Sequence, residues 1–424
     1  MGPARRHFLL TPVGSSGDVH PFVGIGRALR ERGHDVTLLT AEPFRRISER
    51  AGLHFVATQS EEAFDRLTKH PDLWHSRRGL TLVLQTLAST MRGDYPRIAA
   101  AYAPGRTVLV GHALSFATRV FEDVHGAPAA TLHLAPSIFR SDYQQPTQVP
   151  GTDTSSLPLW VKRTMWWLVD RWLIDPHIVP ELNRWRRELG LQPVSRVFKG
   201  WLHSPRLVIG LFPEWFASIQ PDWPPQLRLT GFPLYDEPDE HALSPGLQAF
   251  LDGGSPPVLF TPGSANRAAS QFFVAALAAT RRLRRRALFL TRYPEQLPAP
   301  LGPDVWHEPY VPFSQVLPRC AAIVHHGGIG TCAQGLAAGV PQLTMPLGFD
   351  QPDNTTRLWR LGVGRWVRPH LFHGERLATE LAALLGDARA AERCGHWARA
   401  MRGSDPIAET CALLETLVPE KSEI

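Results

Sequence analysis

Short apolar segments, each followed by a turn and a helical pattern, recur along the chain. His7–Thr11 predicts a buried strand and Phe22–Arg32 a helix, with a glycine-containing turn between them. Gly33 ends this helix as a C-terminal glycine does, and Asp35–Thr40 predicts the next strand. The order strand, turn, helix, strand is typical of the first repeat of a doubly wound α/β domain.

The same pattern continues through the rest of the first half. Phe139–Thr154 is rich in Pro, Gln, Ser and Asp and predicts a loop. Pro233–Pro245 combines prolines with acidic residues and has no strand signal, as a linker does. The other segments predict strands at Leu53–Val56, Thr107–Gly111, Ala129–His133, Leu207–Leu211 and Leu227–Thr230, and helices at Ser115–His125 and Pro180–Leu189.

After the linker the pattern starts again. The predicted strands are Pro257–Thr261, Ala287–Thr291, Val305–Tyr310, Ala321–Val324 and Pro341–Met345, and the predicted helices are Gln271–Arg281 and Thr331–Ala338. We therefore expect an α/β fold of two doubly wound Rossmann-like domains facing across a deep cleft. The expected limits are 1–235 for the N-terminal domain, 236–248 for the linker, 249–402 for the C-terminal domain and 403–424 for a helix packing back on the N-terminal domain.

One predicted helix, Leu157–Asp175, is unusually rich in tryptophan. Its sequence LPLWVKRTMWWLVDRWLID places apolar residues around most of the circumference. It is therefore either clamped between other elements or lines an apolar cavity. Contact of these aromatic side chains with lipid is a third alternative, because basic residues lie between them.

Composition narrows the possible classes. The length of 424 residues agrees with two domains. The net charge is +6, but the excess is spread along the chain, and its densest run, Arg281–Arg286, follows a helical segment as a solvated helix end does. We therefore expect attraction to anionic substrates or a membrane surface and no binding of nucleic acid. The four cysteines show no metal-binding or disulfide spacing.

The sequence also favours a cytoplasmic location. No secretory signal precedes the first strand, and no apolar run is long enough to span a bilayer. Peripheral contact with the inner membrane is a further expectation.

The turn after the first strand places polar side chains at the start of a helix. It lacks GxGxxG, and no acidic residue ends the next strand, so a nicotinamide dehydrogenase is disfavoured. Asp18 is a candidate catalytic carboxylate, with His20 two residues later; a helix-capping role is the alternative for Asp18. His112 follows another predicted strand and is a candidate to face the same site, although a lone histidine more often satisfies a local hydrogen bond.

The segment Val324–Asn354 has the layout of an anion-binding site. A strand leads through two histidines and three glycines into a helix that includes Thr331. Small residues let the backbone approach a diphosphate, and the unpaired amides of the next helix face it. Asp350 and Gln351 follow the next strand, at the sheet edge where ligands bind. The alternative is a tight turn and a loop carboxylate without function.

Two spaced motifs resemble signatures of the bacterial family-1 nucleotide-sugar glycosyltransferases with the GT-B fold. VHHGGIGT followed by AAGVP, MPL and DQPDN is similar to their donor-binding signature, and GSSGDVHPF is similar to their amino-terminal signature. The resemblance extends from His7 to about Leu417. Within the family, four further blocks are most similar to the rhamnosyltransferase subunit of bacterial rhamnolipid synthesis: Trp201–Pro205, Leu211–Phe216, Asp222–Pro224 and Thr230–Leu234.

The resemblance implies inverting transfer of a sugar to an acceptor hydroxyl. Asp18 stands where plant and animal relatives have His and would be the general base, with His20 as its rival. Relatives have an Asp near the position of His112 that partners the catalytic His, so here His112 is expected only to orient or contact the acceptor. A single displacement without a covalent intermediate inverts the anomeric carbon.

The resemblance also implies how the donor is held. His325, the amides from Gly328 to Thr331 and the Thr331 hydroxyl would contact the diphosphate. Because these donors stabilise the leaving group and no DxD-like carboxylate pair is present, no metal and no cofactor besides the nucleotide-sugar is expected. The remaining donor-side residues are Asp350 and Gln351 for sugar hydroxyls, Tyr310 and the Val311 backbone for the pyrimidine, Ser15 and Ser264 for phosphate or sugar, and the turn glycines Gly327, Gly328 and Gly330.

One departure from the family pattern bears on the identity of the donor. Plant relatives have a Glu that binds the ribose hydroxyls two residues after the equivalent of Thr331, where this chain has Ala333, so a dTDP-sugar is favoured over a UDP-sugar. The acceptor is expected to be a hydrophobic small molecule or lipid bound by His112, Trp160, Trp166 and Trp167. The main interpretation is transfer of L-rhamnose from dTDP-L-rhamnose to a 3-(3-hydroxyalkanoyloxy)alkanoate, giving mono-rhamnolipid.

Three alternatives stay open. A natural-product O-glycosyltransferase would act on a flavonoid, polyketide or macrolide with a dTDP- or UDP-sugar. A nucleotide-sugar epimerase of similar fold would need no hydrophobic acceptor pocket, so the Trp-rich segment argues against it. A non-catalytic partner that activates another glycosyltransferase typically lacks donor residues, whereas His325, Thr331, Asp350 and Gln351 are present here.

Overall fold

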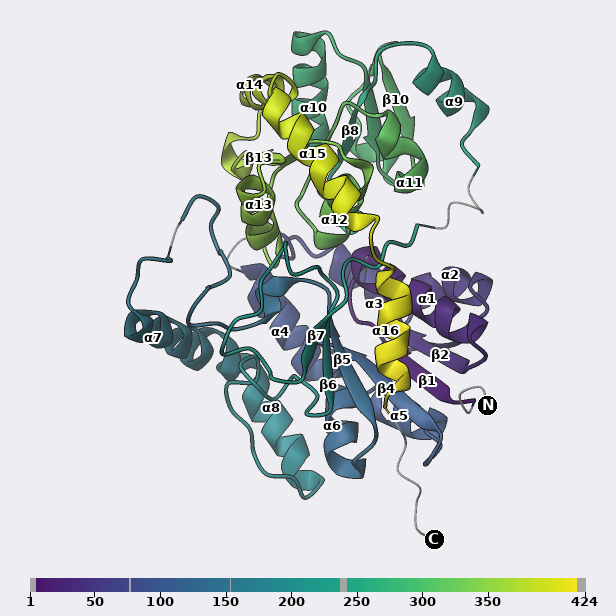
Figure 1. Ribbon diagram of the computed structural model, residues 1–424, viewed down its shortest axis with the longest axis vertical. Helices are drawn as coiled ribbons and strands as arrows, with labels where there is room; N and C mark the ends of the chain where they lie inside the picture. Colours follow the sequence, from purple (N-terminus) through teal and green to yellow (C-terminus); the bar gives the residue numbers. More distant parts are fainter. Residues whose placement is uncertain (1–4, 76–77, 153, 237–241, 418–424) are drawn as a thin grey trace. The chain divides into compact units, whose positions relative to one another are not determined.

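The computed structural model describes residues 5–75, 78–152, 154–236 and 242–417, which form two compact units, each with a parallel sheet (Figure 1). The first unit comprises the described parts of 1–147, 152–233 and 405–424, and the second those of 148–151 and 234–404. The expectation of two doubly wound α/β domains is confirmed. Within the predicted linker 236–248, residues 237–241 lie outside the described residues, and a helix already begins at Pro245.

The first sheet has the strand order β3-β2-β1-β4-β5-β6-β7, with every neighbouring pair parallel. The order reverses between β1 and β4, where Leu10 pairs with Leu38 on one side and Val110 on the other. Ligands of such sheets bind at the carboxyl ends of the strands beside this reversal. The strands are β1 (His7–Thr11), β2 (Asp35–Thr40), β3 (His54–Ala57), β4 (Thr107–His112), β5 (Ala129–His133), β6 (Leu207–Gly210) and β7 (Leu227–Leu229).

Helices pack on this sheet and bury a continuous apolar core. Leu9 and Leu109 of the sheet contact Phe116 and Phe121 of the following helix in one cluster of buried side chains. The helices are α1 (Ser16–Glu31), α2 (Arg45–Arg50), α3 (Glu61–Thr68), α4 (Arg78–Thr90), α5 (Tyr95–Ala101), α6 (Phe116–His125), α7 (Leu159–Val169), the π-helical turn η3 (Asp170–Ile174), α8 (Asp175–Glu188) and α16 (Pro406–Glu415), with short 3₁₀ turns η1 (Glu42–Phe44) and η2 (Pro136–Ile138).

The last helix, α16, belongs to the first unit although it follows the second in the sequence. It packs beside α1, as Figure 1 shows. Arg32 at the end of α1 forms an ion pair with Glu415 at 2.9 Å, and the Thr410 hydroxyl lies 2.9 Å from that of Thr230. Helix α16 is therefore fixed to the first unit by polar contacts as well as by buried Cys411 and Leu414.

The second sheet has the order β10-β9-β8-β11-β12-β13 and is also entirely parallel. Its strand order reverses between β8 and β11. The strands are β8 (Val258–Thr261), β9 (Ala287–Leu290), β10 (Val305–Glu308), β11 (Ala322–His325), β12 (Gln342–Thr344) and β13 (Gly364–Trp366). The helices are α9 (Pro245–Asp252), α10 (Ser270–Leu283), α11 (Phe313–Val316), α12 (Ile329–Ala338), α13 (Gln351–Arg360), α14 (Gly374–Leu385) and α15 (Ala388–Met401), with 3₁₀ turns η4 (Pro294–Gln296), η5 (Leu317–Arg319) and η6 (Pro369–Leu371).

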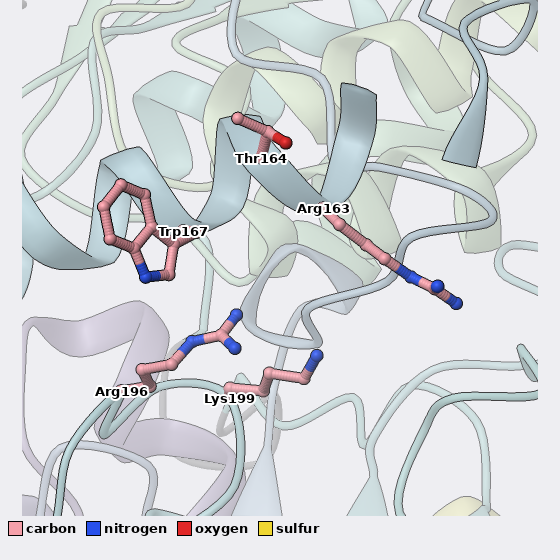
Figure 2. A pocket seen from close by; sticks show the side chains of 5 residues that line it. All are labelled: Arg163, Thr164, Trp167, Arg196 and Lys199. Atoms are coloured by element: carbon pink, nitrogen blue, oxygen red, sulfur yellow. The ribbon is translucent and has the colours of Figure 1, made fainter. Parts of the chain in front are cut away.

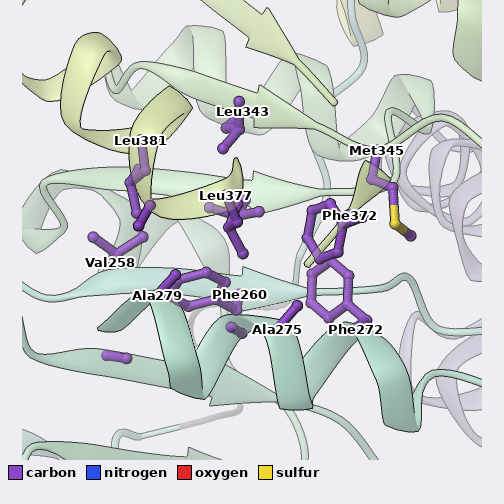
Figure 3. Close-up of a cluster of buried hydrophobic side chains, with 14 of the residues drawn as sticks. Val258, Phe260, Phe272, Ala275, Ala279, Leu343, Met345, Phe372, Leu377 and Leu381 are labelled. Carbon is purple, nitrogen blue, oxygen red and sulfur yellow. The ribbon is translucent and has the colours of Figure 1, made fainter. Parts of the chain in front are cut away.

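One buried apolar cluster of the second unit lies between this sheet, α10 and α14, and another includes Leu247, Leu251 and Val311. Figure 3 shows Phe260 of β8 above Phe272 of α10, with Leu377 of α14 closing the layer. The rings of Phe272 and Phe372 stack 5.1 Å apart at an interplanar angle of 7°. This core holds the ends of β8 and β11 in fixed positions, and the donor-site candidates follow those strands.

Candidate active site

The turn from β1 into α1 is built around the contact between Ser15 and Asp18. Asp18 is the third residue of α1, and its Oδ2 accepts hydrogen bonds from the Ser15 backbone N–H at 2.7 Å and the Ser15 hydroxyl at 3.2 Å. This is the acidic half of a capping box. A Cβ on Gly14, whose φ is +136°, would collide with the same carboxylate, so only glycine fits there. Asp18 thus has the helix-capping contact, which also fixes its carboxylate at the carboxyl edge of the sheet.

His112 lies on the same side of α1 as Asp18. The residue ends β4, and its ring packs edge-on against Phe22 with the centroids 6.2 Å apart. Phe22 is four residues after Asp18 and so shares its helix face. Burial lowers the pKa of His112 to about 4, so the ring is neutral at pH 7. His20 is two residues after Asp18, about 200° around the helix, so the two candidate bases point in different directions.

A buried pair of histidines that was not predicted from the sequence lies at the carboxyl edge of the first sheet, near His112. His133 ends β5, and its Nε2 lies 2.9 Å from Nδ1 of His203. Burial lowers the pKa of both rings, that of His203 to about 4, and proximity to His112 lowers that of His133 further. His133 was not among the predicted site residues. It could have been found from the sequence, because it ends the predicted strand Ala129–His133 just as His112 follows the predicted strand Thr107–Gly111.

In the second unit, two glycine turns enclose the ring of His326. A Cβ on Gly263 would lie 2.7 Å from Cε1 of His326, and one on Gly328 would lie 2.5 Å from Nε2. Gly263 follows β8 and His326 follows β11, so the ring lies where the strand order reverses. Burial lowers its pKa to about 4, and its buried Nδ1 has no hydrogen-bond partner among the described residues. A neutral imidazole in this position can donate a hydrogen bond to a phosphate oxygen.

His325, which was expected to contact the diphosphate, is fully buried at the end of β11. Its Nδ1 accepts a hydrogen bond from the Gly327 N–H at 3.1 Å, and its Nε2 lies 3.0 Å from Oε1 of Gln342. Burial, reinforced by neighbouring His326, lowers its pKa to about 3. Both ring nitrogens are thus engaged inside the unit, where they shape the glycine turn. The diphosphate role of His325 stays a prediction.

The N-terminus of α12 carries the remaining phosphate candidates. Gly328 is the N-cap residue, has extended backbone angles and provides no capping side chain, while Gly330 and Thr331 lie in the first turn. The first amides of such a helix lack intrahelical acceptors and favour an anion. Asp350 lies beside this turn, because its carboxylate accepts hydrogen bonds from the Ile329 backbone and, at 2.7 Å, from the Asn354 side chain.

Burial raises the pKa of Asp350 to about 6, while the hydrogen bonds to its carboxylate act in the opposite direction. Asn354 also donates to the Gly327 carbonyl at 3.0 Å, so it joins Asp350 to the glycine turn. Gln351 is buried, and its Oε1 accepts from the backbone of Leu347 at 2.7 Å. Its amide nitrogen is therefore the end that can donate to a sugar hydroxyl.

The residues expected to hold the base occupy other strand ends. Tyr310 follows β10, and its hydroxyl donates to the Asp236 carbonyl at 2.9 Å while the Arg292 guanidinium lies 5.8 Å from the ring centroid. The Val311 side chain is in the core, so only its backbone could face a ligand. Ser264 is exposed in the turn after β8. Their ligand contacts stay predictions.

The tryptophan side chains of the Trp-rich segment differ in burial. Trp166 points inward and donates to the Ser141 carbonyl at 3.1 Å, whereas Trp160 and Trp167 are 70% and 49% exposed. The alternative that this helix is clamped between other elements is therefore wrong for its outer face. Figure 2 shows Trp167 over a pocket of about 290 Å³, which is also lined by Arg163, Thr164, Arg196 and Lys199.

Comparison with known proteins agrees with this organisation. Residues 8–98 match the glycosyltransferase family 28 N-terminal domain, and residues 295–416 match the erythromycin biosynthesis protein CIII-like C-terminal domain. The chain is 30% identical over 437 aligned residues to O-mycaminosyltylonolide 6-deoxyallosyltransferase of Streptomyces fradiae, with 97% of each chain covered. The chain belongs to the GT-B glycosyltransferases.

Further relatives of this glycosyltransferase cover most of its length. It is 29% identical to vancomycin aglycone glucosyltransferase of Amycolatopsis orientalis over 84% of each chain. The crystal structure of the kitacinnamycin glycosyltransferase matches its fold with a TM-score of 0.75 at 20% identity, covering 98% of this chain and 100% of the other. The calicheamicin glycosyltransferase CalG4 matches with a TM-score of 0.70, again at 20% identity, over 99% and 100% of the two chains.

The predicted fold and the predicted enzyme class, glycosyltransferase, are therefore confirmed. In the part of the chain that the structure describes, none of the helices combines the length and apolar character needed to cross a bilayer.

Proposed function

We propose that this glycosyltransferase transfers a 6-deoxyhexose from a dTDP-sugar to a hydroxyl group of a macrolide-like natural product, with inversion at the anomeric carbon. The observation that carries the proposal is the similarity, over 97% of both chains, to an enzyme named for 6-deoxyallosyl transfer to O-mycaminosyltylonolide. The relative named for the vancomycin aglycone is also a natural-product glycosyltransferase. These relatives favour the natural-product alternative over the rhamnolipid interpretation.

Two observations support a thymidine nucleotide. Ala333 is buried in α12 and offers no acceptor for a ribose 2′-hydroxyl, so a deoxyribose loses nothing at this position. Among proteins of the same fold, spinosyn rhamnosyltransferase was solved with thymidine diphosphate, with a TM-score of 0.63 to this chain at 18% identity. Another, the Streptomyces sp. SF2575 glycosyltransferase, was also solved with that nucleotide, with a TM-score of 0.64.

The leaving diphosphate is stabilised by donors that are fixed before the reaction. The first amides of α12 and the imidazole of His326 lie at the reversal of the second sheet, and Thr331 is in the first turn of the same helix. Rigid donors aimed at developing charge stabilise a transition state without reorganisation. We assign the direct phosphate contact to His326, because both ring nitrogens of His325 are engaged by Gly327 and Gln342.

The sugar is oriented by Asp350 and Gln351. Above its raised pKa of about 6, Asp350 is ionised and accepts hydrogen bonds from sugar hydroxyls. Gln351, held by the Leu347 backbone, donates from its amide nitrogen. Together they present the anomeric carbon to the acceptor.

The chemical step is one displacement. Asp18 takes the proton of the acceptor hydroxyl as that oxygen bonds to the anomeric carbon, and the bond from the anomeric carbon to the diphosphate oxygen breaks at the same time. The electron pair of that bond leaves with dTDP. The Ser15 contacts, 2.7 and 3.2 Å long, hold the Asp18 carboxylate in one orientation. The step uses hydrogen-bond donors of this chain for charge stabilisation, so we propose that it proceeds without a resident metal.

Product analysis tests the proposal. The purified enzyme is incubated with dTDP-rhamnose, dTDP-glucose or UDP-glucose against a macrolide aglycone, a hydroxy-fatty-acid dimer and a flavonoid, and product masses are recorded. Glycosylated macrolide formed from a dTDP-sugar is the expected result. Transfer only to the fatty-acid dimer would restore the rhamnolipid interpretation, and release of free sugar or an epimer without transfer would contradict the proposal.

A further inference from the structure

The segment Leu159–Leu173, formed by α7 and most of η3, has its polarity inverted relative to an ordinary surface helix. Its inward-facing residues Lys162, Trp166 and Asp170 are buried and four positions apart, so they form one stripe. Its exposed side is mostly apolar, with Arg163, Thr164 and Arg171 between the apolar residues. Seven of the fifteen large apolar side chains that are exposed in the described residues lie here: Leu159, Trp160, Met165, Trp167, Leu168, Trp172 and Leu173. We call these seven residues the α7 patch.

Polar contacts hold two of the three residues of the inward stripe, Lys162 and Asp170. Lys162 Nζ donates to the carbonyls of Tyr143 and Ser155 at 3.2 and 3.0 Å. Asp170 is paired with Arg140 at 3.3 Å and with Arg196 at 3.2 Å. A helix anchored through charged groups does not need tryptophan on its solvent side for stability. The α7 patch therefore requires a partner to explain it.

The charge around the patch points to the partner. Asp170 is the only acidic residue between Leu159 and Leu173, and it is 2% exposed. The exposed charges beside the patch are Arg163, Arg171 and Lys199, and Arg171 lies over Trp172 at 5.0 Å. Figure 2 shows the Arg196 and Lys199 side chains below α7, while Arg163 of α7 extends to one side of them. Arg163 is paired with Asp142 at 3.0 Å. The surface thus combines tryptophan and aliphatic side chains with a cationic border.

We propose that the α7 patch docks on an anionic lipid membrane surface, an interaction beyond the proposed glycosyl transfer. Tryptophan favours the water–lipid boundary, aliphatic side chains enter the acyl region, and Arg and Lys reach the headgroups. A second copy of this chain fits less well, because a two-fold contact would oppose one cationic border to another. The π-helical turn η3 brings Trp172 and Leu173 onto the exposed side that Trp160 and Trp167 begin.

Vesicle co-sedimentation tests this docking with the full chain. Phosphatidylcholine vesicles with phosphatidylglycerol are expected to bind the wild type strongly and more weakly at high salt, whereas pure phosphatidylcholine binds it poorly. Trp160→Ser combined with Trp172→Ser should lower the partition coefficient at least tenfold. Arg171→Gln combined with Lys199→Gln should lower it about fivefold for each charge removed.

Trp359→Ser is the matched control, because Trp359 is 59% exposed on the second unit, outside the patch. It should bind vesicles like the wild type, and all variants should keep the wild-type unfolding midpoint. The Arg171/Lys199 variant tests the proposal even if the double tryptophan variant folds poorly. Equal binding of the wild type and patch variants would overturn the proposal. So would a concentration-dependent wild-type dimer that the patch variants abolish, since the partner would then be a second copy.

Discussion

The imidazole of His326 occupies the space that a side chain on Gly263 would need, since a Cβ there would lie 2.7 Å from its Cε1. The contact joins the turn after β8 to the turn after β11 at the reversal of the second sheet. His326→Ala should raise the KM for the dTDP-sugar about tenfold to a hundredfold, the usual effect of losing one hydrogen bond to a charged group. Steady-state kinetics with varied donor and saturating acceptor measure this.

His325→Ala is the matched comparison, because the two histidines are adjacent and both neutral. Loss of its contacts with Gly327 and Gln342 should lower the free energy of unfolding by about 1–3 kcal/mol. A urea titration of both variants separates the roles. If instead His325→Ala weakened donor binding at unchanged stability and His326→Ala had no effect, the diphosphate contact would belong to His325.

Asp18 should combine a catalytic and a structural role. Asp18→Asn keeps an oxygen that can accept from the Ser15 N–H but cannot take a proton, so the transfer rate should fall about 10²- to 10⁴-fold with little change in stability. Asp18→Ala should lose the same activity and, in addition, about 1 kcal/mol of stability from the helix cap. Calorimetric binding of dTDP should be nearly unchanged in both. Retained turnover in Asp18→Asn would remove Asp18 from the base role and promote His20.

The sequence predicted the fold and the strand ends at which the candidate site residues lie, for identifiable reasons. Buried parallel strands are continuous apolar runs bounded by turns, so β1, β2 and β5 were predicted at their observed limits and most other strands to within one or two residues. The candidates after β1, β8, β11 and β12 follow from one rule, that ligands bind at the carboxyl ends of strands.

Other features depend on packing that a linear pattern does not encode. His325 and His326 are adjacent in the sequence, yet one is enclosed in hydrogen bonds and the other lies between Gly263 and Gly328. Apolar periodicity also could not show that Lys162 and Asp170 face inward while Trp160 faces outward. Lys162 and Asp170 can be buried because a backbone carbonyl and an arginine are their partners, and the periodicity of the sequence does not reveal such partners. Helical spacing therefore shows which residues share a face of a helix. It does not show which face is buried when charged residues on that face are paired.

Donor binding should weaken in mild acid. Burial raises the pKa of Asp350 to about 6, so the carboxylate gains a proton as the pH falls through that value and stops accepting from sugar hydroxyls. The donor KM should therefore rise between pH 7 and pH 5, measured in overlapping buffers at constant ionic strength. Asp350→Asn should have a high donor KM that no longer changes in this interval. A wild-type profile without an inflection near pH 6 would argue against an ionised Asp350 at the sugar.

The same shift predicts a stability effect of opposite direction. The folded protein keeps the proton on Asp350 up to about pH 6, whereas the unfolded chain releases it near its ordinary pKa of 3.8. Between these values the folded state binds more protons, so this group's contribution to stability falls as the pH rises. Asp350→Asn should therefore raise the unfolding midpoint relative to wild type more at pH 7.5 than at pH 4. An identical difference at both values would contradict the raised pKa.

Replacement of Gly14 should destabilise the protein, whereas replacement of Gly17 should be tolerated. A Cβ on Gly14 would meet the Asp18 carboxylate, and its φ of +136° is unfavourable for other residues. In contrast, the nearest atom to a Cβ on Gly17 is 3.9 Å away. Gly14→Ala should thus lose about 1–3 kcal/mol of stability together with transfer activity. Gly17→Ala should keep both, as thermal unfolding and turnover can show. Equal tolerance of the two substitutions would mean that the Ser15–Asp18 contact does not define the turn.

Metal removal should leave the reaction intact. Transfer measured after EDTA treatment should proceed at the untreated rate, because the α12 amides and His326 stabilise the leaving diphosphate. Loss of activity that Mg²⁺ restores would show that a cation shares this role.

The central claim is that the enzyme glycosylates a natural product from a dTDP-sugar. The most direct measurement is a competition in one vessel, with a dTDP-6-deoxyhexose donor and equal amounts of a macrolide aglycone and a hydroxy-fatty-acid dimer, followed by product mass over time. The ratio of the two product rates equals the ratio of kcat/KM for the two acceptors. We predict that the macrolide glycoside predominates at least tenfold. Predominance of the glycolipid would contradict the account.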